Sequence, residues 1–517
     1  MIMEEINQKT NRLILIAISL ANFIVMMDYT IINVALQTIQ VNFNASNAEL
    51  QWMVSSYEIL YASLLLPAGF LSDRYGRKKV MMLGLIVFIL SSGLIAFSES
   101  TMQIIVARGL MGLGGAVVPS TTLAIIKETY KKYDQAKAIG VWSAFGGSSI
   151  AIGPIIAGFL LQMYPWYSVF TINLPIGLIC LIIIMKLVPN TSDKHKNKLD
   201  LIGMILSVLG VSLILYGIIK SGELNKIFTI NTGGAIIIGI IIVLFLLKYE
   251  YKINNPMLEL SLLCDRIFTS GTISISLSYF TISGGTYLFV FFIQLVKKST
   301  PFELGLMMLP FAIGSIIGSL FSERMLNLKG AKFTIIMSCF LLLLGFIGFY
   351  ISDGTTDNFL IEAFFLLIGL GMGIAMGGTT FFTMSEIPQN KYGSGAGLSN
   401  TIRGVTSIMG VGVLGTIYSI SYQKSINLVL SESNVELDKF SRESYSQTIN
   451  FFKNGNFNPE LVDQILKRGE DIFLYSFHKG LFVGIIIILI NIILGLIFIP
   501  RRVESRQIEK STGKTIC

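Results

Sequence analysis

The sequence predicts an all-α integral membrane protein, because of its composition, its long uncharged segments and the placement of its basic residues. Of the 517 residues, 53% are hydrophobic and only 14% are charged, whereas soluble domains carry about 25% charged residues. The mean hydropathy is +0.70. Residues 80–98 and 333–352 contain no charge and have the roughly 20-residue length that crosses a bilayer. These features exclude a soluble enzyme, a disordered chain and a disulfide scaffold.

Uninterrupted apolar runs predict fourteen membrane-spanning helices. The first run follows Arg12, is longer than the apolar core of a secretory signal peptide and lacks a small-residue cleavage site. We therefore expect a retained spanning helix there. Glycine is frequent, at 49 residues, as is typical of membrane helices that approach each other closely. The predicted spans are 13–36, 51–71, 79–97, 102–125, 138–162, 167–188, 201–220, 231–249, 267–296, 302–322, 332–351, 358–384, 395–420 and 477–499.

The distribution of lysine and arginine predicts that both termini lie in the cytoplasm. When the N-terminus is placed inside, most basic residues fall in the inner segments, including the cluster at 74–79 and the tail after Pro500. The short outer loops then carry only Lys220, Lys226, Lys297 and Lys298. Basic residues are enriched in the cytoplasmic loops of membrane proteins. The asymmetry therefore gives the orientation and requires an even number of spans.

One outer segment, residues 421–476, is long and mixes polar with apolar residues. We expect it to form a partly helical extracellular loop, because long loops are translocated regardless of charge. The net charge of +8 is explained by the cytoplasmic loops. No basic stripe carries the interleaved aromatic residues that nucleic-acid binding needs, so no nucleic-acid partner is expected.

Two short segments indicate an internal repeat. Ser72-Asp73-Arg74 follows the second predicted span, and Ser322-Glu323-Arg324 follows the tenth. A six-span unit repeated with two additional helices between its copies gives this separation, and chance similarity of two basic loops is the alternative. The predicted organisation is an N-terminal six-helix bundle (1–188), a linker with two additional helices (189–250), a C-terminal six-helix bundle with the extracellular loop 421–476 (251–500), and a cytoplasmic tail (501–517).

Residues 69–79 carry the most specific motif in the chain. Their sequence, GFLSDRYGRKK, resembles the G-x-L-x-D-R-x-G-R-K-K signature of the major facilitator superfamily. In the first span, residues 28–36 (DYTIINVAL) resemble the D-x-T-x-x-N-x-A-L signature of its fourteen-span drug:proton antiporters. By resemblance, the loop is a charged gate between the halves, and simple anchoring by positive charge is the alternative. The motif residues are Gly69, Asp73, Arg74, Gly76, Arg77 and Lys78 in the loop, and Asp28 and Asn33 in the span.

Further segments resemble motifs of the same subfamily. Arg108 begins an R-x-x-x-G motif in span four, and residues 140–158 follow the antiporter motif of span five. Tyr167 stands where the subfamily usually has arginine after the tryptophan. In span five we expect either a bend that seals against proton leak or ordinary close packing. The remaining motif residues are Gly140, Ser149, Gly153, Pro154 and Gly158 in span five, Trp166, Asn173 and Pro175 at the start of span six, and Arg403 in span thirteen.

The resemblance implies a major facilitator fold, with two six-helix bundles and two extra central helices, and a multidrug efflux function. Such a protein is expected to export lipophilic, cationic drugs or toxic compounds across the bacterial plasma membrane by alternating access, driven by the proton gradient. Its expected partners are small lipophilic substrates, protons and membrane lipid, and it is expected to be a monomer. An exporter of a lipid, fatty acid or cell-envelope metabolite is the alternative, and a non-transporting scaffold or sensor is a third hypothesis.

No cofactor, metal or enzyme activity is expected. The sequence contains no Walker A motif, which disfavours drive by ATP. Its four cysteines and two histidines do not have the spacing of metal ligands, and no Ser-His-Asp arrangement is evident.

Three ionisable side chains lie inside predicted spans of the first half, where each costs about 2.5–3.5 kcal/mol or more. Counting residues from the span ends places Asp28, Glu58 and Arg108 at one depth, roughly 10–12 Å below the outer face. Arg108 stays protonated and can hold one carboxylate ionised. The other carboxylate is then expected to exchange protons and to bind a cation when deprotonated. The alternative is a structural Asp28–Arg108 ion pair, with Glu58 facing water near the outer mouth.

Two further predictions concern the interior. Arg403 lies inside span thirteen and is either a charge in the inner cavity or a partner for backbone carbonyls. Aromatic and methionine side chains either line a lipophilic pocket or belong to the core. They are Met26, Met27, Tyr29, Tyr57, Tyr61, Phe145, Tyr279 and Tyr287.

Overall fold

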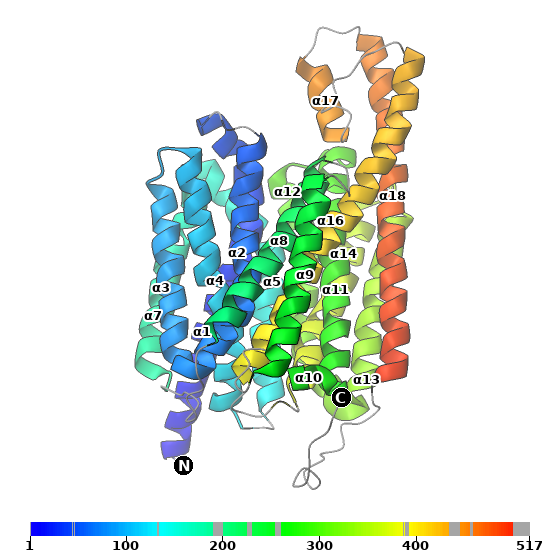
Figure 1. Ribbon diagram of the computed structural model, residues 1–517. Coiled ribbons are helices and arrows are strands. Elements are labelled where there is room, and N and C mark those ends of the chain that lie inside the picture. Colours follow the sequence, from blue (N-terminus) through cyan, green and yellow to red (C-terminus); the bar gives the residue numbers. More distant parts are fainter. Residues whose placement is uncertain are drawn as a thin grey trace.

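The structure, a computed structural model, consists of helices and short connections over the residues that it describes (Figure 1). Twelve helices are long and apolar enough to cross a membrane, or thirteen when the bent helix over Gln135–Met163 counts as one span. The all-α membrane fold is therefore confirmed, and the protein is a multi-pass membrane protein. The described residues are 2–43, 45, 47–131, 134–189, 200–224, 230–253, 260–385, 387, 392–433, 445–454 and 459–499.

The helices of the first half start and stop at residues suited to those positions. The Ser100 hydroxyl accepts the backbone N–H of Gln103 and so caps the fourth helix. Gly76 separates the second and third helices with φ at 101°, a conformation that glycine adopts without strain. The helices are α1 (Ile2–Phe43), α2 (Asn47–Tyr75), α3 (Arg77–Ala96), α4 (Thr101–Thr129), α5 (Gln135–Met163), α6 (Ser168–Thr171) and α7 (Asn173–Leu187).

Two inserted helices and the second half follow. Here Asp265 and Asp357 cap the helices that begin after them, and Thr300 forms a capping box with Glu303. The inserted helices are α8 (Leu201–Leu224) and α9 (Ile230–Lys252). The second half contains α10 (Leu260–Cys264), α11 (Arg266–Phe291), η1 (Phe292–Val296), α12 (Pro301–Met307), α13 (Leu309–Tyr350), α14 (Asn358–Ile374), η2 (Ala375–Thr379), α15 (Thr380–Met384), α16 (Tyr392–Ser433), α17 (Tyr445–Asn454) and α18 (Pro459–Phe498).

Helix α13 consists of two helices that run in opposite directions. Gly330 interrupts the helical backbone with φ at 81° and ψ at 172°. Before this break, Gly318 packs against residues 370–374 of α14, and after it Ser338 packs against Gly371 and Gly345 against residues 364–368. The chain therefore reverses at Gly330. Residues 302–350, included above as one candidate span, therefore form two helices. The described residues then contain thirteen candidate spans, or fourteen when the bent α5 is included.

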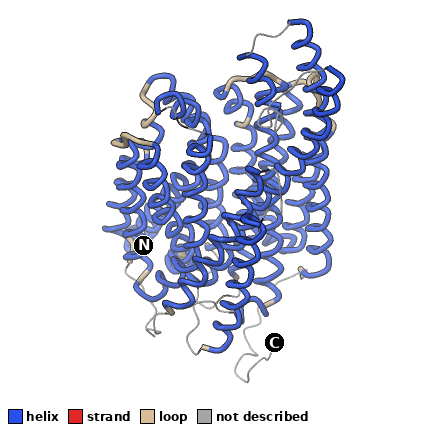
Figure 2. The backbone as a smooth tube through the Cα atoms, turned by 45° about the horizontal axis from the view of Figure 1, so that its top comes forward, coloured by secondary structure: helices blue, strands red, loops and turns tan. Residues whose placement is uncertain are grey.

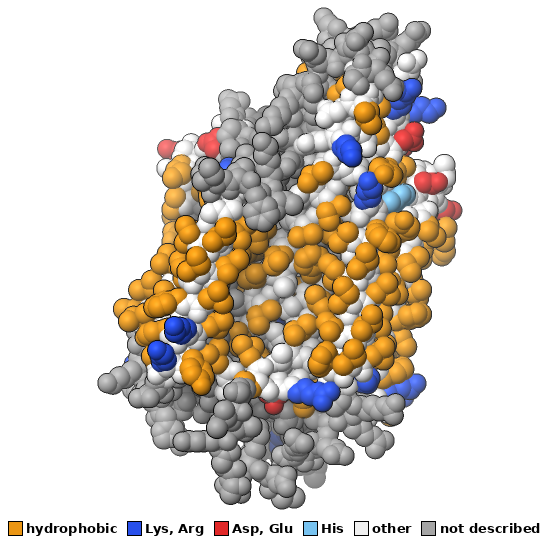
Figure 3. Space-filling model, turned by 45° about the vertical axis from the view of Figure 1, so that its right-hand side comes forward, with side chains coloured by type: hydrophobic (Ala, Val, Ile, Leu, Met, Phe, Trp, Pro, Cys, Tyr) orange, Lys and Arg blue, Asp and Glu red, His pale blue; other side chains and the backbone are white. Residues whose placement is uncertain are grey.

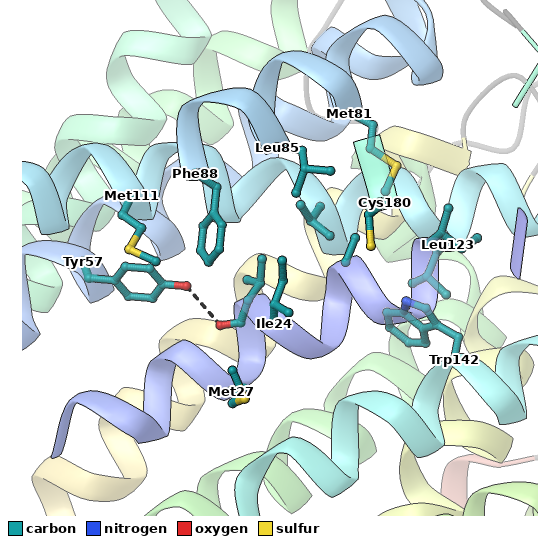
Figure 4. Close-up of a cluster of buried hydrophobic side chains, with 14 of the residues drawn as sticks. Ile24, Met27, Tyr57, Met81, Leu85, Phe88, Met111, Leu123, Trp142 and Cys180 are labelled. Carbon is teal, nitrogen blue, oxygen red and sulfur yellow. Dashed lines mark hydrogen bonds between the residues drawn. The ribbon is translucent and has the colours of Figure 1, made fainter. Parts of the chain in front are cut away.

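The helices form two groups that lie side by side (Figures 1 and 2). One large cluster of buried hydrophobic side chains comes mainly from α1–α7 and a second comes from α11–α18. In the first cluster, the Tyr57 hydroxyl donates to the backbone oxygen of Val25 at 3.2 Å (Figure 4). We call the end of the molecule where α1 begins and α18 ends the inner end, and the opposite end, which carries α17, the outer end (Figure 1).

Two pairs of helices make the most extensive contacts between the halves. Helix α16 crosses α2, where a methyl group on Gly397 would lie 3.0 Å from the backbone oxygen of Leu65. Helix α13 meets α5, where a methyl group on Gly140 would lie 2.9 Å from the backbone oxygen of Ser319. The inserted helix α8 packs on α2 and α16 together through Leu215. Small residues therefore bring the two halves into close contact.

The outer end extends beyond the bundles on one side only (Figure 1). Helix α16 continues to Ser433 and α18 begins at Pro459, so both run further into the predicted loop 421–476 than expected. The reason is a small core of aromatic side chains, in which the Tyr422 hydroxyl donates to the Thr448 hydroxyl of α17 at 3.0 Å. The segment is partly helical over its described residues.

The surface has an apolar middle (Figure 3). Hydrophobic side chains cover the central part of the face shown, and lysine and arginine side chains gather toward its two ends. Large exposed residues such as Leu90, Ile241, Phe321 and Ile493 belong to this surface. An apolar face of this extent fits contact with lipid tails rather than water.

Candidate functional site

A buried ion pair links α1 and α4. The Arg108 guanidinium contacts the Asp28 carboxylate, and both side chains are almost completely buried. The Arg108 Nε atom donates to the backbone oxygen of Met53 in α2 at 3.1 Å, and its guanidinium carbon lies 4.4 Å from the centre of the Tyr57 ring. These contacts compensate a charge that is costly inside a membrane protein. Arg108 thus ties three helices together.

Helix α7 supplies a second donor to Asp28. The Asn173 amide nitrogen lies 3.4 Å from Asp28 Oδ1 and 3.2 Å from the Ser92 hydroxyl, which itself donates to the backbone oxygen of Phe170 at 2.8 Å. Arg108 binds the other carboxylate oxygen. Both oxygens of Asp28 are therefore occupied, and a new ligand would have to break this network.

Glu58 lies outside the ion pair. Its carboxyl group lies near the hydroxyl of Tyr29 from α1, and both side chains are half-buried. Among the described residues, no ion pair joins Glu58 to Arg108. The two predicted carboxylates therefore have different environments: Asp28 is sealed and paired, whereas part of Glu58 remains accessible.

A row of tyrosines leads from Arg108 to the second half. Tyr57 stacks on Tyr61, one turn later in α2, with ring centroids 5.7 Å apart and an interplanar angle of 10°. Tyr61 lies near Tyr279 of α11 and Arg403 of α16. The guanidinium carbon of Arg403 lies 5.6 Å from the centre of the Tyr279 ring. Charged residues from both halves thus border the same part of the interior.

The motif loop at 69–79 closes the inner end. Asp73 accepts the backbone N–H of Ser394 at 2.8 Å and its hydroxyl at 3.1 Å, and Ser394 lies in the first turn of α16. The other Asp73 oxygen pairs with Arg77 at 3.2 Å, and Arg77 also pairs with Glu128 of α4. A carboxylate at a helix N-terminus is stabilised by the free N–H groups and the helix dipole. We call Asp73, Arg77, Glu128 and Ser394 the inner latch.

Other contacts at the inner end also join the halves. The Lys127 ammonium of α4 donates to the backbone oxygen of Met384 at 2.8 Å. Gly69 lies against Gly397 of α16, where a methyl group on Gly397 would be 3.3 Å from the Gly69 Cα. The structure is therefore closed at this end. Among the remaining loop residues, Arg74 and Lys78 are half-buried and Gly76 is the turn residue with positive φ.

The small residues of span five face two neighbours. Helix α5 bends by 46° between residues 149 and 152, where the ring of Pro154 removes one backbone donor. The Ser149 hydroxyl donates to the backbone oxygen of Gly146 at 2.6 Å. Gly153 faces Met27 and Thr30 of α1, whereas Gly158 faces Phe302 of α12. Helix α5 is thus both bent and closely packed, and the seal against proton leak stays a prediction.

The motif that opens span six holds the start of α7 against the bundle. The Trp166 ring makes edge contacts with Phe43 at 5.3 Å and with Phe170 at 6.3 Å. Pro175 is exposed in the first turn of α7, so it lies away from the interior polar groups. The side chain of Asn33 lies outside the described residues.

Sequence reasoning did not identify the partners of several site residues. Ser394 is 321 residues away from Asp73, although a serine at the start of a predicted helix is a typical capping residue. Tyr29 was predicted only as a pocket or core residue, and its position near Glu58 depends on how α1 and α2 pack.

Comparison with known proteins identifies the family. The model of the Major Facilitator Superfamily matches residues 18–411, more than half of the chain. The chain is 29% identical to the multidrug resistance protein Stp of Mycobacterium tuberculosis over 412 residues, covering 79% of this chain and 76% of Stp. It is 28% identical to the methyl viologen resistance protein SmvA of Salmonella typhimurium over 475 residues, covering 91% and 94%.

Two further similarities bear on cargo and fold. The riboflavin transporter RibZ of Clostridioides difficile is 25% identical over 414 residues, covering 80% of this chain and 89% of RibZ. The crystal structure of the human organic anion transporter MFSD10 superposes with a TM-score of 0.61 at 13% identity, covering 94% of this chain and 99% of that one. At this identity the structural likeness concerns the fold alone.

Proposed function

Because the chain belongs to the Major Facilitator Superfamily, we propose that it exports lipophilic, cationic compounds across the bacterial plasma membrane in exchange for protons. The names of Stp and SmvA support an exporter of drugs or toxic compounds. One observation carries the coupling mechanism. Glu58 is a half-buried carboxyl group that lies near the Tyr29 hydroxyl and outside the Asp28–Arg108 pair, which is already complete.

Glu58 couples the two fluxes because it binds either a proton or a cation. In its deprotonated form, the carboxylate attracts a positively charged cargo inside an interior of low dielectric. Protonation removes that attraction and releases the cargo. A proton that enters from outside at Glu58 thus expels the cation, and deprotonation toward the cytoplasm prepares the site for the next one.

The Asp28–Arg108 pair keeps this exchange confined to Glu58. The guanidinium is a permanent positive charge near the site, and Asp28 compensates it. Without that compensation, Arg108 would repel a cationic cargo and hold Glu58 ionised. Asp28 is therefore a positioning residue in this mechanism, and Glu58 carries the proton.

Alternating access requires the inner latch to open. In the present conformation, Asp73 binds the N-terminus of α16 and Lys127 binds the backbone of Met384, so the path to the cytoplasm is shut. Release of these contacts lets the halves part at the inner end while they approach at the outer end. Protonation of Glu58 and cargo binding would bias this equilibrium, because each has a different affinity for the two states.

The test is ethidium uptake into everted membrane vesicles with and without a proton gradient. Glu58→Gln preserves shape but cannot ionise, so we expect gradient-driven uptake to fall by about tenfold or more. Asp28→Asn leaves Arg108 buried without a counter-charge, which costs about 3–5 kcal/mol, and is expected to lower both uptake and thermal stability.

The matched control is Glu362→Gln, which removes a half-buried carboxylate from α14 in the second half and is expected to keep wild-type uptake. Unchanged uptake by Glu58→Gln would exclude Glu58 from coupling. If wild-type uptake were unchanged when an uncoupler dissipates the proton gradient, proton exchange itself would be excluded.

A metabolite is the second candidate cargo, because RibZ, described as a riboflavin transporter, is also a relative. A panel that includes riboflavin beside ethidium in the same vesicles separates the two. Gradient-driven uptake of riboflavin without uptake of ethidium would favour the metabolite.

A further inference from the structure

Arg403 is a buried charge whose hydrogen bond, among the described residues, stays within its own half. The side chain is only 4% exposed and lies within the spanning part of α16. Its guanidinium donates to the side-chain oxygen of Asn400, one turn earlier, and lies over the ring of Tyr279 of α11. No hydrogen bond from Arg403 reaches the first half within the described residues, so it does not serve as a tie between the halves.

The charge of Arg403 has no carboxylate partner in the part of the chain that the structure describes. Its Nε atom and the amide nitrogen of Asn400 are buried donors without an acceptor. The Tyr279 ring beneath the guanidinium compensates only part of the charge. Arg108, by contrast, has Asp28, and its Nε donates to Met53. Two buried donors that point to no acceptor are costly unless a ligand satisfies them.

The side chains around Arg403 border accessible interior space. Tyr61 and Tyr279 are both half-buried, although each lies well inside its spanning helix. Tyr61 comes from α2 of the first half and Tyr279 from α11 of the second, and both lie near Arg403. Tyr61 follows Glu58 by three residues on α2, which is one helical turn. The surroundings of Arg403 and of Glu58 are therefore parts of one continuous region.

We propose that Arg403 and Asn400 form a second binding site, which takes an anionic or hydrogen-bond-accepting oxygen of the cargo. The class of ligand is a lipophilic aromatic compound that bears a carboxylate or a carbonyl group. The rings of Tyr61 and Tyr279 pack against its apolar body, and the guanidinium donates to its oxygen. This inference rests on the proposed export function and adds that the preferred cargo is zwitterionic, with its cationic group at Glu58 and its acceptor at Arg403.

Rhodamine B and its ethyl ester are suitable probes because they share one cationic aromatic body. Rhodamine B carries a free carboxylate, which the ester lacks. Binding to the purified full-length protein in lipid nanodiscs is followed by fluorescence polarisation. We expect the wild type to bind rhodamine B more tightly than the ester. Arg403→Gln should weaken rhodamine B binding about tenfold more than ester binding.

Asn400→Asp provides an independent variant that retains the arginine. It places a carboxylate beside the guanidinium, and this carboxylate should form an ion pair with Arg403. The preference for rhodamine B over the ester should then decrease, as it does in Arg403→Gln. Arg324→Gln is the matched control, since it removes an exposed arginine at the inner end of α13 and should leave both affinities unchanged. Thermal unfolding of each variant verifies that it is folded.

Three results would overturn the proposal: a wild type that binds neither dye, a wild type without preference for the carboxylate, or variants that weaken both dyes equally. Equal weakening would assign Arg403 a structural role. Failure of the proposed export function is recognised in a different experiment. In that case the wild type takes up no ethidium into vesicles, whichever rhodamine dye it prefers to bind.

Discussion

The two repeated turns at the inner end share a backbone design but differ in what they hold. In the first half, α2 ends at Gly76 with φ at 101°, and in the second half the helix break in α13 falls at Gly330 with φ at 81°. Each turn contains a serine whose hydroxyl donates to a carbonyl three residues earlier, at 2.8 Å for Ser72 and 2.6 Å for Ser322. The repeat therefore preserves the reversal of the chain.

The acidic residues in these turns are not equivalent. Asp73 binds the start of α16 across the interface between the halves. Glu323 makes no ion pair or hydrogen bond within the described residues. Its turn is longer, because Gly330 follows Ser322 by eight residues whereas Gly76 follows Ser72 by four. The N-terminus of α5, the counterpart of α16, begins after Asp134, an acid that would repel Glu323. The comparison teaches that only one of the two repeated turns closes the inner end.

The largest expected effect follows from removing Asp73, the acidic residue of the turn in the first half. Asp73→Ala leaves Arg77 and the N-terminus of α16 without their acceptor, and we expect gradient-driven ethidium uptake to fall by about tenfold or more. Glu323→Ala should stay within about twofold of the wild type. Equal losses in both variants would show that the second turn also takes part in closure.

A smaller effect concerns the feature that the turns share. Gly76→Ala and Gly330→Ala each place a side chain in a backbone region reserved for glycine, which costs about 1–3 kcal/mol. We therefore expect similar decreases in the thermal unfolding temperature of the detergent-solubilised protein. A large decrease for one variant alone would contradict a common backbone design.

The smallest expected effect distinguishes the two groups of Ser394 that donate to Asp73, its backbone N–H and its hydroxyl. Ser394→Ala removes the hydroxyl bond to Asp73 but keeps the backbone N–H, so a loss of about 0.5–1.5 kcal/mol is expected at the inner latch. Ethidium uptake should fall less than in Asp73→Ala. The control is Ser322→Ala, whose hydroxyl bond stays within its own helix. A drop as large as that of Asp73→Ala would mean that the hydroxyl, rather than the helix terminus, holds the latch.

The fold could be predicted from the sequence to a large extent, since a membrane span needs only a long run without charge. The ends of α16 and α18 could not, because their extension depends on aromatic packing among Tyr422, Tyr445 and Phe473, which no local sequence pattern indicates. In the site, residue counting put Asp28, Glu58 and Arg108 at a common depth. It could not say which carboxylate pairs with Arg108, since this depends on rotation of the helices about their axes.

The inserted helix α8 has a mechanical consequence. It rests on α2 and α16 together, with Leu215 against Ala62 and Ile408, and with Tyr216 stacked on Trp52. Within the described residues, no third long helix covers the contact between α5 and α13 in this way. The halves are thus held together by an additional helix at the α2–α16 contact only, and we expect their separation to be wider where α5 and α13 meet directly.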